Sequence, residues 1–228
     1  MYGTGRSIGD AQLDANVIRV PCDHSDDSAV EQLFARIDAE SGRIDILVNC
    51  AWGGYERMVE NGRFTWADPF WKQPRWRWDA MMIAGVRSAF VASQLAAQRM
   101  LARRHGLIVH ISSWAAQKPL GNVLYGIAKG AADKMAMDMA SELKSHGITV
   151  VSLYPGLVRT EAVVNAGVFD LSNSESPEFI GRAIAALASD ADALRWSGRV
   201  LVAAELAREY GFTDVDGKQP RPLTLADA

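Results

Sequence analysis

Along the chain, short runs of aliphatic and β-branched residues alternate with longer segments whose apolar residues recur every three or four positions. The short runs predict buried strands, and the longer segments predict amphipathic helices. The predicted strands cover residues 16–20, 44–49, 107–112, 148–153 and 198–203. The predicted helical segments include residues 30–37, 76–104, 123–145 and 177–188. This alternation is typical of βαβ units, so we expect an α/β fold with a parallel sheet and ligands at the carboxyl ends of its strands.

The composition narrows the class of protein. The 228 residues are 49% hydrophobic and 22% charged, which excludes global disorder and suits one domain. A formal charge of −3 provides no basic field for nucleic acid or an anionic membrane, and no apolar run reaches the roughly 18 residues of a spanning helix. The first six residues do not resemble a signal peptide. Cys22 and Cys50 are too few for a disulfide framework or a zinc site. We therefore expect a single-domain, cytoplasmic protein without a metal.

Four motifs follow predicted strands in chain order. They are Asn49-Cys50-Ala51, then Ser113, then Tyr125 and Lys129 in a Tyr-x-x-x-Lys pattern, and finally Pro155-Gly156-Leu157-Val158-Arg159-Thr160. With these motifs the chain resembles the short-chain dehydrogenase/reductase family over residues 2–220. The segment 206–218 and the Trp-rich segment 64–78 resemble one group of that family most closely. The resemblance implies a Rossmann-type doubly wound parallel sheet with helices on both faces.

The spacing of Tyr125 and Lys129 suits acid–base chemistry. Residues four apart share one face of a helix, and an ammonium group beside a phenol lowers the phenol pKa from its usual value near 10. Such a tyrosine could protonate a carbonyl oxygen or deprotonate an alcohol. The resemblance implies that Tyr125 is the general acid/base, that Lys129 tunes it and binds the cofactor ribose, and that Ser113 polarises the substrate. A nicotinamide would supply the hydride.

Each of these assignments has a plainer alternative. Tyr125 and Lys129 could form the solvated face of an amphipathic helix, and Ser112 could be the active serine in place of Ser113. Two histidines have no partner at metal-ligand spacing and are predicted to be structural, namely His24 and His110.

The resemblance also implies a cofactor site. Its residues would be Arg6, Asp23, Asn49, Ala51, Lys129, Pro155, Gly156, Val158 and Thr160. Asp23 would meet the adenine edge, although it could instead cap a helix. Asn49 could simply tie strands together, and Pro155-Gly156 could be an ordinary turn.

The start of the chain allows two interpretations. Residues 4–9 partly match the glycine-rich TGxxxGxG motif that binds the cofactor pyrophosphate in the family. However, only 13 residues separate Gly9 from Asp23, too few for the elements that belong between them. We therefore favour residues 2–6 as the end of the second strand, with room for only about two helical turns after it. Arg6 would then pair with the 2′-phosphate of NADP, or be an ordinary exposed arginine.

Two parts of the family pattern are absent. On the favoured interpretation the chain lacks the first strand and the glycine-rich loop, so we expect a preceding segment to be missing. That strand lies at the centre of the sheet order 3-2-1-4-5-6, so its neighbours would be left with open edges. Gly85 stands where the family has an asparagine that anchors a proton-relay water. We expect that either a water or another group substitutes for it, or that the proton relay is slower.

The resemblance predicts an NADP(H)-dependent oxidoreductase that interconverts a carbonyl and an alcohol, with NADPH preferred and NAD possible. The alternative is a non-catalytic relative that acts as a binding or structural subunit. We expect Trp52, residues 64–78 and the segment after Thr160 to line a pocket for a small apolar substrate, although these aromatic residues could instead pack a satellite core or an interface. The helices 78–103 and 123–145 resemble those that associate in the family, so a homodimer or homotetramer is expected.

Overall fold

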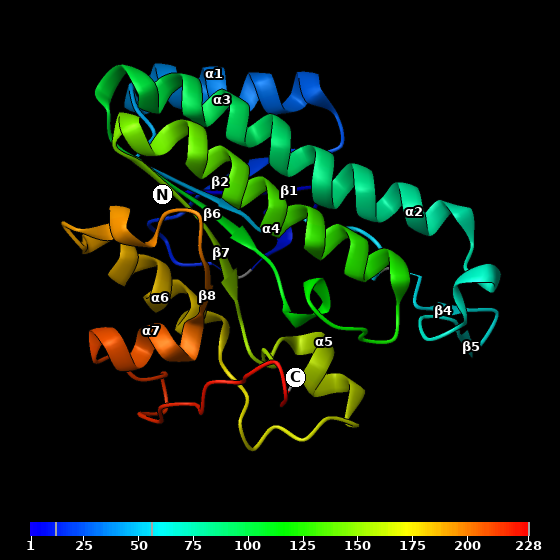
Figure 1. Ribbon diagram of the computed structural model, residues 1–228. Coiled ribbons are helices and arrows are strands. Elements are labelled where there is room, and N and C mark those ends of the chain that lie inside the picture. Colours follow the sequence, from blue (N-terminus) through cyan, green and yellow to red (C-terminus); the bar gives the residue numbers. More distant parts are fainter. Residues whose placement is uncertain (12, 56, 228) are drawn as a thin grey trace.

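A computed structural model describes residues 1–11, 13–55 and 57–227, and it shows a central sheet between two layers of helices (Figure 1). Helices α1 (Asp27–Ser41), α3 (Ser88–Arg103) and α4 (Val123–Leu143) cover one face. Helices α6 (Pro177–Ser189) and α7 (Ala203–Tyr210) cover the other face. This arrangement confirms the predicted Rossmann-type α/β fold with helices on both faces of a parallel sheet.

The strands form two separate parallel pieces. The larger piece has the strand order β3 (Ile46–Asn49), β6 (Gly106–Ile111), β7 (Ile148–Tyr154) and β8 (Val200–Val202). The smaller piece pairs β1 (Tyr2–Gly5) with β2 (Ile18–Pro21). Within the described residues no backbone pairing joins β1 to β3, so each of these strands has the open edge that the sequence predicts.

A cavity of about 930 Å³ lies between the open edges of β1 and β3. Helices on both faces of the sheet contribute to its lining, with Phe34 on α1, Ala92 on α3 and Ile184 on α6. On β3 itself, Ile46 and Val48 remain 42% and 39% exposed. Apolar strand residues are normally covered by a neighbouring strand or helix. In the part of the chain that the structure describes, the two pieces of sheet are therefore joined by side-chain packing, with Tyr2, Val20 and Leu47 in one apolar cluster, and not by backbone hydrogen bonds.

Each face of the sheet has its own apolar core. The first contains Phe34 from α1, Ala96 from α3 and Ala140 from α4, packed on Ile108 and Val150 of the central strands. The second is built by α6, α7 and β8 on the opposite face, and it centres on Leu107, Val109, Val151, Leu153, Phe179, Leu187 and Leu206. Because β6 and β7 are covered on both sides, their residues form unbroken apolar runs.

Residues 75–103 form one continuous helix of 29 residues. It comprises α2 (Arg75–Met81), a π-helical segment (Met82–Arg87) and α3, whereas the sequence pattern predicts a regular helix over residues 76–104. By length and composition alone this helix could cross a membrane. Its residues Ala92, Ala96 and Met100, however, are buried in the core shared with α1 and α4.

The connecting segments contain short elements that the sequence pattern does not predict. The long connection 52–75 holds a hairpin of β4 (Val59–Glu60) and β5 (Arg63–Phe64), followed by a 3₁₀ turn (Phe70–Lys72). Residues 8–10 form a single 3₁₀ turn where two helical turns were expected, and residue 12 lies outside the described residues. The remaining short elements are Trp114–Ala116, Lys144–His146, α5 (Glu161–Ala166) and Ala193–Trp196.

Candidate active site

Helix α4 carries the predicted pair Tyr125 and Lys129 near its N-terminus. The helix begins after Asn122, whose side-chain oxygen accepts a hydrogen bond from the backbone N–H of Tyr125 at 3.1 Å. Gly126 lies against the turn 114–116, because a Cβ atom there would come within 3.1 Å of the Ala115 carbonyl oxygen. The missing side chain therefore lets the segment after Ser113 pack directly beside the start of α4.

Lys129 reaches back from α4 to the end of β6. Its Nζ atom donates a hydrogen bond to the carbonyl oxygen of Ile111 at 3.0 Å. The same Nζ lies 4.4 Å from the ring centroid of Trp52 and 5.6 Å from that of Tyr125. Burial lowers the pKa of Lys129 to about 8, while the nearby Cys50 and Asp133 oppose this shift. The ammonium form therefore still predominates at pH 7.

Tyr125 lies within a cluster of aromatic rings. The ring centroids of Trp52 and Trp66 are each 5.5 Å from that of Tyr125, and the Tyr55 centroid is 6.3 Å away. Burial raises the pKa of Tyr55, and a hydrogen bond with Tyr125 adds to this effect. Three of the rings come from the connection that follows β3. These three rings form an apolar wall around Tyr125.

The two candidate serines differ in what they bind. Ser112 is buried, and its hydroxyl donates to the backbone carbonyl of Lys129 at 3.1 Å, which ties β6 to α4. Ser113 is half-buried and begins the turn 114–116, where its side-chain oxygen accepts from the N–H of Ala115 at 3.3 Å. The hydroxyl proton of Ser113 is not used in that contact. These contacts favour Ser113 over Ser112 as the substrate-binding serine.

Asn49 is the last residue of β3, Ala51 follows it, and both line the cavity beside the strand. The side-chain amide of Asn49 donates to the hydroxyl of Ser93 at 2.9 Å and lies 3.5 Å from the ring nitrogen Nδ1 of His110. Asn49 thus joins β3, α3 and β6, which is the strand-tying role left open for it. Burial lowers the pKa of His110 to about 4, so this histidine is neutral near pH 7.

At the ends of β1 and β2, Arg6 and Asp23 lie near each other. The backbone carbonyl of Gly5 accepts from the N–H of Cys22 at 3.2 Å, which aligns the two strand ends. Asp23 accepts from the backbone N–H and the hydroxyl of Ser25 at 2.9 and 2.6 Å. These hydrogen bonds lower the pKa of Asp23, and the charge of Arg6 lowers it further. The N-cap of α1 is Asp26, so the alternative assignment of Asp23 as a helix cap is wrong.

The loop that contains Pro155, Gly156, Val158 and Thr160 is fastened by a residue that the sequence analysis missed. Glu175 is only 2% exposed, and its Oε2 atom accepts from the N–H of Gly156 at 2.8 Å. Its backbone bonds to the same loop on either side of Val158, while Thr160 begins α5 as its N-cap. Glu175 lies in the polar stretch SNSESP, and a buried glutamate gives no hydrophobic signal in such a sequence.

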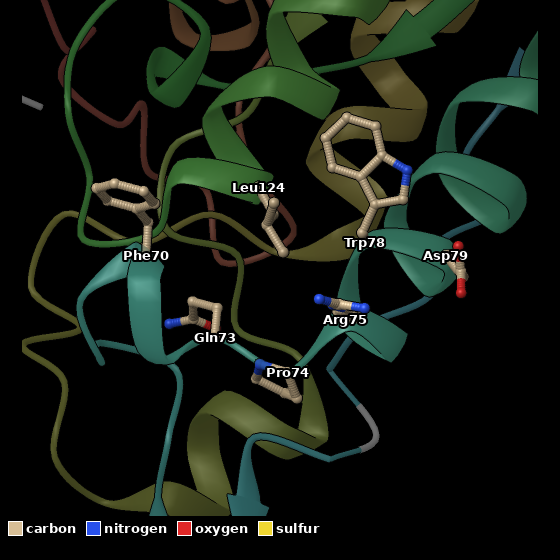
Figure 2. A pocket seen from close by; sticks show the side chains of 7 residues that line it. All are labelled: Phe70, Gln73, Pro74, Arg75, Trp78, Asp79 and Leu124. Atoms are coloured by element: carbon tan, nitrogen blue, oxygen red, sulfur yellow. The ribbon is translucent and has the colours of Figure 1, made fainter.

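The Trp-rich segment does not form one pocket wall. Trp66 contacts Tyr125, but Phe70, Trp71 and Trp78 are exposed. Figure 2 shows a separate open hollow, lined by Phe70, Gln73, Pro74, Arg75, Trp78, Asp79 and Leu124. The prediction that all of residues 64–78 line the substrate pocket is therefore too broad.

A nicotinamide cofactor fits one half of the site. The ammonium of Lys129 and the backbone of the loop 155–160 suit the ribose and nicotinamide half, at the carboxyl ends of β6 and β7. The pyrophosphate half is not supplied by residues 4–9. Gly5 ends β1, which pairs with β2, and only a three-residue 3₁₀ turn follows it, so no helix N-terminus stands there to face a phosphate. The glycine-loop interpretation is therefore wrong, and residues 2–5 are the strand that we favoured.

The comparisons with known proteins agree with this geometry. The family model described as short chain dehydrogenase matches residues 6–168. The mouse protein named dehydrogenase/reductase SDR family member 1 is 38% identical over an alignment of 241 positions, gaps included, which covers 96% of this chain and 76% of that protein. The human protein of the same name is 37% identical over the same shares. These two proteins belong to the group that the segments 206–218 and 64–78 had indicated.

Two solved structures have the same fold. A tyrosine-to-phenylalanine variant of ElxO with NADPH bound superposes with a TM-score of 0.69 at 20% identity, covering 82% of this chain and 77% of that one. A structure described as ribose-5-phosphate isomerase from Brucella melitensis 16M has a TM-score of 0.68 at 24% identity, covering 81% and 72%.

Proposed function

The chain belongs to the short-chain dehydrogenase/reductase family of oxidoreductases, and on this premise we propose that it interconverts a carbonyl and an alcohol, with NADP(H) as the hydride carrier and Tyr125 as the general acid/base. The observation that carries this proposal is the position of the Lys129 ammonium, 5.6 Å from the Tyr125 ring on the same face of α4.

In this proposal, side chains of this chain transfer the proton and orient the substrate. In the reducing direction the Tyr125 hydroxyl gives its proton to the carbonyl oxygen, and in the oxidising direction the phenolate takes it back. The hydroxyl of Ser113 donates to the same substrate oxygen. The nicotinamide, when bound, exchanges the hydride, because no side chain can do so.

Three observations support NADP(H) as the cofactor and an apolar compound as the substrate. Arg6 follows β1, where a guanidinium group suits a 2′-phosphate. The ElxO structure with the same fold holds NADPH. The rings of Trp52, Tyr55 and Trp66 around Tyr125 suit a small apolar ketone or secondary alcohol.

We further propose that the protein is a homodimer or homotetramer that associates through α3 and α4. Exposed apolar side chains on these two helices are Phe90, Leu101, Val123, Ile127 and Met137. Association of copies would cover these residues and gain hydrophobic free energy.

The mechanism is tested with Tyr125→Phe. We expect kcat for NADPH-dependent reduction of a panel of apolar ketones to fall by about 10²–10⁴-fold, because the proton donor is lost while the ring is kept. Tyr210→Phe serves as the matched control, since Tyr210 lies on α7 and hydrogen-bonds to Asp190. An unchanged kcat in Tyr125→Phe would refute the mechanism.

The second candidate function is a non-catalytic binding subunit. Two observations favour it. One is the cavity between β1 and β3, and the other is that the described site has residues for the nicotinamide half of the cofactor only. Steady NADPH turnover with any ketone of the panel would eliminate it. Binding of NADPH by a folded chain without turnover of any panel member would support it.

A further inference from the structure

The indole of Trp52 fills the space between the backbone of the long helix and the ammonium of Lys129. On one side, a Cβ atom at Gly85 would come within 2.8 Å of the Cε3 and Cζ3 atoms of the Trp52 ring. On the other side, Nζ of Lys129 lies 4.4 Å from the centroid of that ring. A third contact is edge-to-face, with Tyr125 at 5.5 Å and an interplanar angle of 88°. One ring therefore touches both members of the Tyr-x-x-x-Lys pair.

Ring contacts hold the indole in this position. Its N–H is buried and has no hydrogen-bond partner among the residues that the structure describes. Gly85 lies within the π-helical segment Met82–Arg87, and any larger residue there would push the ring out. The absence of a side chain at Gly85 is thus what makes room for the indole.

A cation 4.4 Å from the centre of an indole is within the range of a cation–π interaction, and tryptophan gives the strongest such contact. Lys129 has one hydrogen-bond acceptor in the described structure, the carbonyl oxygen of Ile111. The carboxylate of Asp133 acts on it only through its charge. Without the ring, the buried ammonium would lose a large part of its stabilisation.

We propose that Trp52 is a positioning residue that holds the Lys129 ammonium beside Tyr125 through a cation–π contact, with Gly85 kept small to admit the ring. This inference rests on the proposed function for its catalytic meaning, although the contact itself can be measured without turnover. The Trp52 ring occupies the space beside Gly85 and stabilises the ammonium, but a ring face does not relay protons. The expectation of a slower proton relay is therefore unchanged.

The ionisation of Lys129 tests this proposal. The protein is labelled at the lysine side-chain nitrogen with ¹⁵N, and Lys129 is assigned among the six lysines by comparison with Lys129→Arg. In Trp52→Met, which removes the ring and keeps an apolar side chain, we expect the pKa of Lys129 to fall by about 0.5–1.5 units. Trp52→Phe should give a smaller fall, because it keeps a ring. Gly85→Ala should lower the pKa in the same direction by displacing the indole.

Trp71→Met is the matched control, because Trp71 is 71% exposed and contacts Phe70 instead. A pKa that is unchanged or raised in Trp52→Met would overturn the proposal, because the indole would then act only by filling space or excluding water. If Trp52→Met fails to fold by circular dichroism, Trp52→Phe and Gly85→Ala decide the question in the same way. The outcome is independent of Tyr125→Phe kinetics, so failure of this inference and failure of the proposed function are distinguishable.

Discussion

The carboxylate of Glu175 accepts a hydrogen bond from the backbone N–H of Gly156, with 2.8 Å between Oε2 and the nitrogen. The backbone of Glu175 makes two more bonds of 2.8 Å to the same loop, one to Leu157 and one to Arg159. A Cβ atom at Gly156 would lie 3.0 Å from the carboxylate, so a larger residue there would force the Glu175 side chain to shift. One buried residue thus fixes the turn that follows β7 at the active site.

Glu175→Gln should change the pH dependence of stability. Burial raises the pKa of Glu175 from 4.5 to about 7; Asp214 adds to the rise, while Gly156 and Arg159 oppose it. Because the folded pKa exceeds the unfolded one, the free energy of unfolding falls as pH rises from about 4.5 to 7. The glutamine keeps the acceptor and does not titrate, so we expect it to gain about 2–3 kcal/mol relative to wild type between pH 5 and pH 8.

Urea unfolding at several pH values measures this difference. Glu178→Gln, at an exposed position on α6, should follow the wild-type pH profile. Parallel profiles for wild type and Glu175→Gln would contradict the assignment of this titration to Glu175.

Asp214→Ala should be strongly destabilising. The buried carboxylate accepts from the N–H groups of Ser176 and Val215 at 2.9 and 2.7 Å, and it pairs with Arg159 at 3.0 Å. Removing it leaves two backbone N–H groups, the Ser176 hydroxyl and Nη2 of Arg159 without their acceptor, so we expect a loss of about 3–5 kcal/mol. Chemical denaturation tests this, with the exposed Asp216→Ala as a control expected within about 0.5 kcal/mol of wild type. A small effect at Asp214 would mean that water replaces the carboxylate.

The pH dependence of Asp214→Ala stability tests the direction in which the pKa of Asp214 is shifted. The hydrogen bonds from Ser176 and Val215, together with the Arg159 pair, hold the pKa of Asp214 below its usual value against the effect of burial. Asp214 therefore contributes to the free energy of unfolding at pH values above its unfolded pKa near 3.9. This contribution is lost as the pH falls through its pKa in the folded state. The difference between wild type and Asp214→Ala should shrink in strong acid.

Arg6→Ala should discriminate between the two nicotinamide cofactors. If the guanidinium binds the 2′-phosphate, its loss removes a charge-assisted hydrogen bond, and the Kd for NADPH should rise about 10–100-fold. The Kd for NADH should stay within about twofold, because NADH has no 2′-phosphate. Fluorescence titration measures both constants, with Arg36→Ala on α1 as control. Equal losses for NADPH and NADH would show that Arg6 does not read the 2′-phosphate.

Phe90→Glu should dissociate the proposed oligomer. Phe90 on α3 is 49% exposed, and a charge in an apolar interface is costly. We expect light scattering coupled to size-exclusion chromatography to give a mass of one chain for the variant and of two or four chains for wild type. Phe169→Glu changes an equally exposed phenylalanine outside α3 and α4 and should leave the mass unchanged. A monomeric wild type would refute the proposed association.

Much of the fold could be predicted because its central strands are unbroken apolar runs. β6 and β7 are buried on both faces, so burial and sequence pattern coincide there. The hairpin β4–β5 was missed although the sequence holds a signal for it: Asn61 and Gly62 both adopt positive φ in its two-residue turn, and Asn-Gly is the preferred sequence for that turn. The π-helical segment Met82–Arg87 left no signal in the sequence, because a change of helical period arises from tertiary packing.

The candidate site was predictable where motifs mark it and unpredictable where packing creates it. The spacing of Tyr125 and Lys129 indicated a shared helix face, which the structure contains. The contact of Lys129 with Trp52 depends on a residue 77 positions away, as the numbering of the chain shows. Glu175 likewise acts through the backbone of Gly156, and no local pattern reports such a partner.

The open edges of β1 and β3 also predict where the molecule opens first. No ladder of backbone hydrogen bonds connects β1 and β2 to the larger piece of sheet within the described residues. Amide hydrogen exchange should therefore divide the protein into a less protected unit around β1 and β2 and a more protected unit around β6 and β7. Arg6 and Asp23 belong to the first unit, and Tyr125 and Lys129 pack against the second. A dinucleotide that bound residues of both units would join them. Its affinity would be reduced by the free energy needed to order the unit around β1 and β2 against the unit around β6 and β7.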